Sequence, residues 1–172
     1  MTFFKTLLLV ALTVPVLTAC DSDDVTDETI TDLVVAEADL STLELAVIEA
    51  GLDGALAGSG TFTVFAPTDA AFQSLLATLG ATPEELLARD DLDDILNLHV
   101  VPGEIRSGDL EDGAEVTTRN GETLTVVSVG SGFGLDTEDD DDLPNAIIRT
   151  ADILASNGVV HKIDGVLLPA GN

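Results

Sequence analysis

Two histidines are the side chains of this chain that titrate nearest to neutral pH, and both lie in apolar segments. His99 follows Leu98 at the end of a helical pattern, and His161 lies between Val159 and Ile163 in an alternating run. An imidazole that is open to substrate can serve as a general base or a metal ligand. Because alternation places His161 on the same face as its two apolar neighbours, we expect a half-buried ring bonded to backbone or water. A structural role is therefore favoured for both histidines.

The chain lacks the usual sequence signatures of a nucleophile or a nucleotide site. No serine or cysteine stands in a recognisable nucleophile elbow, and no glycine-rich fingerprint follows a strand and opens a helix. A single cysteine can form neither an internal disulfide nor a cysteine-rich zinc site. We therefore expect a protein that is not an enzyme and that carries no cofactor.

The densest run of charge is DTEDDDD, over residues 136–142. Asp139, Asp140, Asp141 and Asp142 offer the hard oxygen ligands that calcium prefers, but the spaced DxDxDG pattern and the terminal glutamate of a specific calcium loop are absent. A solvated loop is the favoured interpretation. A weakly bound calcium ion at these four aspartates remains the alternative.

Overall charge excludes two classes of partner. The 172 residues contain 32 Asp and Glu against 6 Lys and Arg, which gives a formal net charge of −26. Such a field repels nucleic acid and anionic lipid head groups. The hydrophobic fraction of 45% nevertheless allows a sizeable core, and the length suits one domain of ordinary size. The oligomeric state is not predicted.

The first twenty residues have the form of an export signal. Lys5 precedes an apolar stretch from Leu7 to Val16, and the segment ends in Leu-Thr-Ala-Cys20. This ending resembles the lipobox of bacterial lipoproteins. The resemblance implies a signal peptide over residues 1–19, acylation of Cys20, and anchoring in a bilayer of the bacterial cell envelope, facing the periplasm or the cell surface. Residues 20–28 then form an acidic tether. The alternative to a lipoprotein signal is an ordinary secretory signal with a cysteine near its end.

Apolar periodicity predicts helices in the first half of the mature chain and strands in the second. Helical spacing recurs within residues 30–34, 40–47, 72–79 and 92–96, and we expect helix starts with caps at Ser41, at Thr68 or Asp69, and at Thr82. A first strand is expected over residues 61–65, and alternation dominates after Pro102. Asn120-Gly121 and Asp164-Gly165 predict hairpin turns, the first of type I′. Segregated α+β structure is favoured over a repeated strand–helix–strand winding.

Four stretches together resemble the fasciclin domain. They are TFTVFAPTDAAF (residues 61–72), LNLHVVPGE (96–104), the Asn120-Gly121 hairpin, and ASNGVVHKIDGVLLP (155–169). They follow one another in the order of that family. The resemblance implies an α+β fold, a compact β-sandwich or wedge with several packed helices, over residues 29–170.

The resemblance also implies a function and candidate sites. Family members usually act in adhesion or as extracellular interaction modules, so we expect binding to a protein or polysaccharide partner. The pair Asp152-Ile153 matches a receptor-binding pair of some animal members, and His99 belongs to the central motif, with Leu98 where many members have tyrosine. These three residues are the candidate partner-binding positions. The alternative function is a periplasmic module that binds a small ligand or a cation such as calcium.

Overall fold

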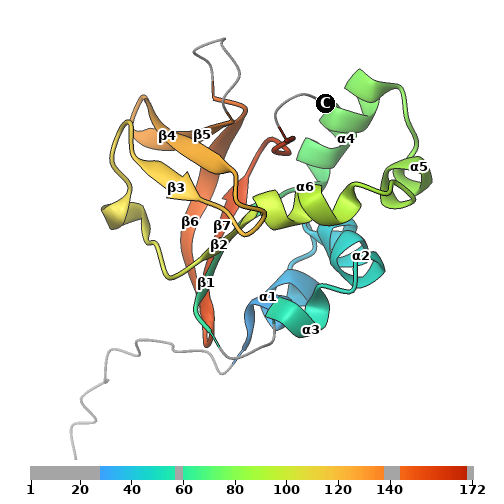
Figure 1. The fold of residues 1–172 in the computed structure, drawn as a ribbon, viewed down its shortest axis with the longest axis horizontal. Coiled ribbons are helices and arrows are strands. Elements are labelled where there is room, and N and C mark those ends of the chain that lie inside the picture. The colour runs from blue at the N-terminus through green and yellow to red at the C-terminus, as the bar shows by residue number, and fades with distance from the viewer. Residues whose placement is uncertain (1–27, 57–59, 138–143, 170–172) are drawn as a thin grey trace, which may run out of the picture.

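The computed structural model describes residues 28–56, 60–137 and 144–169. Six helices and seven strands lie in this part of the chain, and Figure 1 shows the helices gathered on one side of the strands. The helices are α1 (Ile30–Ala36), α2 (Ser41–Glu49), α3 (Asp53–Leu56), α4 (Asp69–Leu79), α5 (Pro83–Leu87) and α6 (Leu92–Leu98), with a 3₁₀ turn, η1 (Ser107–Asp109). The strands are β1 (Phe62–Pro67), β2 (Val100–Pro102), β3 (Glu115–Thr117), β4 (Thr123–Val129), β5 (Gly132–Thr137), β6 (Ala146–Ala155) and β7 (Gly158–Ile163). None of the described helices combines the length and the apolarity needed to cross a membrane.

The seven strands form a single ordered sheet that nearly closes on itself. Their order is β2-β1-β7-β6-β5-β4-β3, and every pairing is antiparallel except that of β1 with β7. The long strand β6 pairs with β5 on one side and with β7 on the other. At the open edge the amide of Arg119 donates to the carbonyl of Val100 in β2, 2.7 Å away. The predicted α+β class and wedge are confirmed, in the form of a near-barrel.

Strand β1 separates two hydrophobic cores. Val64 and Ala66 face a core built with the helices, whereas Phe65 points into the interior of the near-barrel. Side chains alternate between the faces of a strand, so this central strand is buried on both sides. The first core includes residues from α1, α2, α4, α5 and α6, and the second is completed by Leu98, Val101, Leu110, Val116, Leu124, Val126, Leu135, Ala146, Ile163 and Leu167.

Two of the three predicted helix caps are confirmed, and the third is wrong. The Thr68 hydroxyl accepts from the third residue of its helix, and Thr82 forms a complete capping box with Glu85. Ser41 does not cap α2; its hydroxyl instead donates to Asp69 at 2.7 Å, and the amide of Thr42 donates to the same carboxylate at 2.8 Å. The first turn of α2 is therefore capped by a residue of α4.

The two predicted hairpin turns need correction. Asn120 does not adopt a positive φ, so the β3–β4 turn is not type I′; its side-chain oxygen instead accepts from the Thr118 hydroxyl at 2.5 Å and the Glu122 amide at 3.0 Å. Asp164-Gly165 forms a bend after which no strand follows up to residue 169. Competing contacts explain the bend, because the Asp164 carboxylate accepts from the amide of Ile147 at 2.8 Å.

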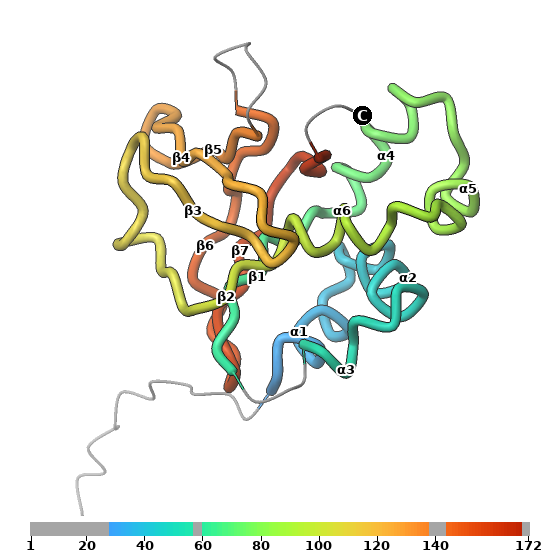
Figure 2. Tube along the Cα trace, in the orientation of Figure 1, coloured from blue at the N-terminus to red at the C-terminus, as the bar shows by residue number. Residues whose placement is uncertain are grey.

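The β6–β7 hairpin ties the end of the sheet to the first helices. Asn157 in its turn accepts from the amide of Ile30 at 2.8 Å and donates to the carbonyl of Leu56. Figure 2 shows the start of the described chain beside this turn. Gly158 follows with φ of +152°, and a Cβ built there would lie 1.8 Å from the carbonyl oxygen of Phe62. Glycine is therefore required where β1 meets β7.

Candidate functional site

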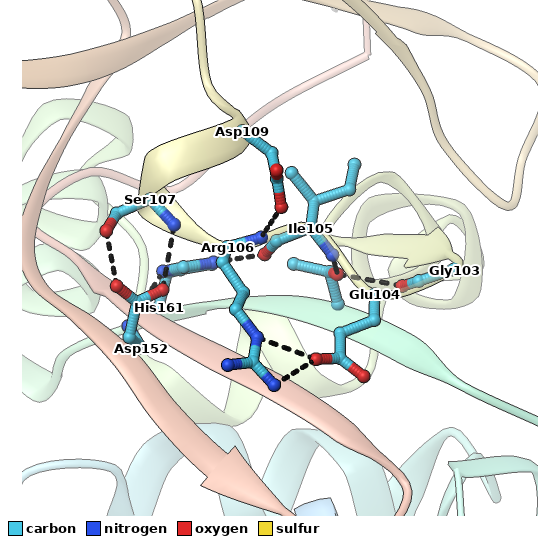
Figure 3. A network of polar contacts seen from close by, with 9 residues as sticks. Gly103, Glu104, Ile105, Arg106, Ser107, Asp109, Asp152 and His161 are labelled. Atoms are coloured by element: carbon cyan, nitrogen blue, oxygen red, sulfur yellow. Dashed lines mark hydrogen bonds and ion pairs between the residues drawn. The ribbon is translucent and has the colours of Figure 1, made fainter.

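Asp152 lies at an irregularity of β6 and has an unusual backbone. The pairing of β6 with β7 shifts register between Thr150 and Ile153. Among the described residues other than glycine, Asp152 alone has a positive φ, of 59°. Aspartate tolerates this left-handed conformation better than most residues, yet such outliers persist only where surrounding contacts hold them. The bulge turns the Asp152 carboxylate toward η1 (Figure 3).

Ser107 is the residue that holds the Asp152 carboxylate. Its amide donates to Oδ1 at 2.8 Å, and its hydroxyl donates to Oδ2 (Figure 3). Burial raises the pKa of Asp152, but the hydrogen bonds from Ser107 and nearby positive charge such as that of Arg106 together outweigh that effect, so the net pKa lies below the usual value. Asp152 is therefore an ionised carboxylate in a fixed orientation.

His161 holds the backbone beneath Asp152. Its Nδ1 accepts from the amide of Asp152 at 3.2 Å, and its Nε2 lies 2.9 Å from the carbonyl oxygen of Ile105. A carbonyl only accepts, so these contacts assign the ring proton to Nε2 in a neutral imidazole. The ring stacks on Phe65 with centroids 5.5 Å apart and is 0% exposed. The expected half-buried position is therefore wrong, whereas the expected bonding to backbone is confirmed.

The chemistry of this cluster differs from that of a nucleophile–base pair. Both nitrogens of His161 are bonded to backbone, and the hydroxyl of Ser107 donates to Asp152 instead of the imidazole. The ring thus has no nitrogen left to take a proton from Ser107. The arrangement orients a carboxylate at the surface, which suits recognition of a partner's donor groups.

A polar segment from Gly103 to Asp109 frames Asp152 on one side. Thr63 of β1 anchors it, donating to the carbonyl of Gly103 and accepting from the amide of Ile105, both at 2.8 Å. The guanidinium of Arg106 pairs with Glu104 at 2.7 Å (Figure 3). This hydrogen bond and charge raise the pKa of Arg106. The segment therefore presents its charges in a fixed arrangement next to the β6 bulge.

A shallow depression of about 290 Å³ adjoins Ser107. Arg149 lies at its edge and pairs with Asp164 at 2.5 Å. The remaining lining mixes small and apolar residues from η1 onward, from β5 and from β6: Gly108, Leu110, Ser131, Gly132, Phe133, Ile148 and Ala151. Asp152, Ser107 and this depression together form the candidate functional site, which we call the Asp152 face.

The other candidate partner-binding residues lie differently. Ile153 follows Asp152 and packs against the helical core. His99 is the C-cap residue of α6 and is only 2% exposed. Its Nδ1 lies 2.7 Å from the carbonyl oxygen of Ile95, and its Nε2 accepts from the amide of Leu167 at 2.9 Å. Burial lowers the pKa of His99 to about 4, although the bond to Ile95 opposes this. His99 is thus placed to hold Leu167 rather than to touch a partner.

Several sequence-predicted positions lie outside the described residues. These are Cys20, the tether as far as residue 27, and Asp139, Asp140, Asp141 and Asp142. No group of three potential metal ligands occurs within residues 28–56, 60–137 and 144–169. Sequence reasoning missed Ser107, because the sequence Ser-Gly-Asp signals only a turn and the partner of Ser107 is 45 positions further along the chain.

The fasciclin domain profile matches residues 38–169. The chain belongs to the fasciclin domain family. The predicted resemblance is thereby confirmed, and α1, which precedes the matched region, packs into the same helical core through Ile30, Leu33 and Val34.

Relatives and a solved structure agree with this assignment. Protein sll1483 of Synechocystis sp. is 40% identical over 144 residues, covering 82% of this chain and 73% of its own length. The ig-h3 protein of Sus scrofa, named as induced by transforming growth factor-beta, is 35% identical, covering 84% of this chain and 20% of its own. A solved fasciclin domain pair from the insect cell adhesion molecule Fasciclin I superposes with a TM-score of 0.69 at 18% identity. This chain spans about half of that structure, with 82% of its own length covered.

Proposed function

We propose that this protein is a lipid-anchored fasciclin-domain protein of the bacterial cell envelope that acts in adhesion by binding a protein or polysaccharide. The observation that carries the proposal is the family match over residues 38–169. A domain pair of the same fold comes from the insect cell adhesion molecule Fasciclin I. The lipobox ending in Cys20 supports the anchor, because two or more acyl chains inserted in a bilayer attach a protein stably.

The Asp152 face is the part of the domain that we assign to partner contact. Its carboxylate is ionised and oriented by Ser107, and Arg106 and Arg149 bring positive charge to the same region. A carboxylate that accepts hydrogen bonds and guanidinium groups that donate them favour binding to hydroxyl-rich sugars or polar peptide surfaces. Holding Asp152 at positive φ also costs backbone energy, which is a pattern found at functional positions.

Adhesion is tested by comparing attachment to surfaces across complemented strains. A deletion strain should attach less than the wild type, and wild-type complementation should restore attachment. Asp152→Asn removes the charge but keeps a residue that tolerates positive φ, so we expect a folded protein with reduced attachment. Asp94→Asn, at an exposed position of α6, is the control with the same loss of charge. Equal attachment of the deletion and wild-type strains over several surfaces and salt concentrations would contradict the proposal.

The anchor is tested separately from the binding site. Cys20→Ala, or inhibition of lipoprotein signal peptidase with globomycin, should leave uncleaved precursor or release the protein from the membrane fraction. Immunoblots of membrane and soluble fractions report both results. Unchanged processing and fractionation would rule out lipidation at Cys20 and leave the ordinary secretory signal.

A further inference from the structure

Helices α1 and α2 carry large apolar side chains that the domain does not cover. Among the described residues, five large hydrophobic side chains are exposed, and three of them lie on these two helices. Val35 is 54% exposed, Leu45 57% and Ile48 58%. On α2, Leu45 and Ile48 are three residues apart and so share a face. Clustered exposed apolar side chains of this size mark sites of interaction.

Two of these side chains line an apolar groove. Val35 and Ile48 lie on the walls of a depression of about 180 Å³ between α1, α2 and α3, whose remaining apolar lining is Val34, Val47 and Leu56. The hydroxyl oxygen of Thr31, which also lines the groove, is buried and has no hydrogen-bond partner among the described residues. A ligand that fills the groove can supply that partner, which removes the cost of an unsatisfied polar atom.

The surroundings of the groove are acidic. Between residues 28 and 56 the chain has no Lys or Arg and seven acidic residues, namely Glu28, Asp32, Glu37, Asp39, Glu44, Glu49 and Asp53. Glu44 and Asp53 line the groove itself, and neither forms an ion pair within the described part of the chain. Among the described residues, Lys162 pairs only with Glu37 and Asp39, at the far end of α1. An apolar ligand entering the groove therefore meets a negative rim.

We propose that this groove between α1, α2 and α3 is a docking site for an amphipathic peptide segment of a partner protein. The segment carries Lys or Arg beside its apolar residues. Apolar anchors at helical spacing fill the groove, and the basic residues pair with Glu44 and Asp53. A second copy of this chain would bring the same acidic rim and be repelled. An anionic bilayer would be repelled for the same reason.

This inference goes beyond the proposed adhesion function and uses different residues. The groove lies on α1, α2 and α3, whereas the Asp152 face is built from η1, β5 and β6. The binding experiment below needs neither Cys20 nor Asp152. Failure of peptide binding therefore leaves the adhesion proposal standing, and loss of adhesion leaves the groove standing.

The test measures fluorescence anisotropy of a labelled 15-residue peptide with the full chain, purified in a non-ionic detergent. The peptide places leucines at i, i+3, i+4 and i+7 and lysines on the flanks. Ile48→Asp and Val35→Asp should each raise its Kd at least about tenfold, because a charge then faces the apolar anchors. Leu79→Asp, an exposed apolar position on α4, is the matched control and should leave the Kd unchanged.

Two further peptides separate groove binding from attraction to a highly acidic protein. A peptide with serine for leucine keeps all lysines and should bind at least about tenfold more weakly. A peptide with glutamate for lysine should also lose binding, and Glu44→Lys should partly restore it. Val35, Ile48 and Leu79 are exposed and Glu44 is partly exposed, so circular dichroism should report unchanged folding of all four variants.

Several results would overturn the proposal. Equal affinity of wild type and Ile48→Asp would show that the peptide binds elsewhere, and equal affinity of the serine peptide would show charge attraction alone. Ile48-dependent self-association in 0.5 M salt would make a second copy the occupant. Ile48-dependent flotation of the Cys20→Ala chain with phosphatidylcholine vesicles would make the bilayer the occupant.

Discussion

At the scale of single residues, the two histidines show how the same side chain serves two positions of one fold. Each ring is neutral, buried and bonded through both nitrogens to backbone groups. His99 joins α6 to the segment after β7, and His161 joins the Asp152 bulge to Ile105. Their apolar sequence context predicted the structural role. The depth of burial was not predicted, because it depends on strands and loops far away in the chain.

His99 gives the domain a stability that depends on pH. Its folded-state pKa of about 4 lies below the unfolded value, so the unfolded chain binds a proton first as the pH falls. The contribution of His99 to the free energy of unfolding is fully present above about pH 6.5. It is lost as the pH falls toward 4, where the loss reaches about 3 kcal/mol.

His99→Gln should lower the free energy of unfolding at pH 7. Because the variant no longer titrates at this position, its deficit relative to wild type should shrink by about 2 kcal/mol between pH 7 and pH 4.5. Urea unfolding at both pH values measures the difference. A deficit that is the same at both pH values would show that His99 is protonated as readily in the folded chain as in the unfolded one.

At the scale of elements, Asp69 couples two helices that are separated by β1. It is the first residue of α4, yet its carboxylate accepts from Ser41 and Thr42 at the start of α2. Burial raises the pKa of Asp69, but these hydrogen bonds outweigh it and the net pKa is lowered. Its contribution to stability is therefore present above the unfolded value of about 3.9 and is lost as the pH falls through the lower folded value.

Asp69→Ala should lower the free energy of unfolding by about 1 to 2 kcal/mol at pH 7, which is typical of a lost helix cap. Asp94→Ala, in the exposed first turn of α6, removes the same charge without such contacts and should change stability by less than about 0.5 kcal/mol. Thermal and urea unfolding report both values. Equal effects of the two substitutions would mean that the contact across the helices contributes only through charge.

Some elements of the fold could be predicted from the sequence and others could not. The period of apolar residues placed the helices α1, α2, α4 and α6, because one buried face imposes that period. Local sequence signals gave wrong predictions where tertiary contacts competed. The helix cap predicted at Ser41 and the hairpin turn predicted at Asp164 are the two examples. In the candidate site, Asp152 could be named from a family motif. Ser107 and the register shift of β6 could not, since nothing near them in the sequence records a partner 45 positions away.

At the scale of the whole molecule, net charge is the dominant feature. A formal charge of −26 on 172 residues makes the folded state repel itself. Screening shortens the reach of this repulsion from about 14 Å at 0.05 M salt to about 4 Å at 0.5 M.

The melting temperature should therefore rise by about 5 °C between 0.05 M and 0.5 M sodium chloride, corresponding to about 1 kcal/mol. Calcium and magnesium chloride at equal concentration separate screening from a specific site. A larger rise with calcium, abolished by replacing Asp139, Asp140, Asp141 and Asp142 with asparagine, would support the cation-binding alternative. A melting temperature that falls with sodium chloride would show that attractive ion pairs outweigh the repulsion.

The parallel pairing of β1 with β7 also governs when the domain can fold. The full length of β1, residues 62–67, pairs with residues 158–163, near the end of the described chain. Until β7 has been synthesised, β1 has only the short strand β2 beside it, and neither core can close. Contacts this distant in sequence form slowly. A nascent chain consequently stays open until residues 158–163 have been synthesised, and this delay would keep it unfolded for the export that we propose.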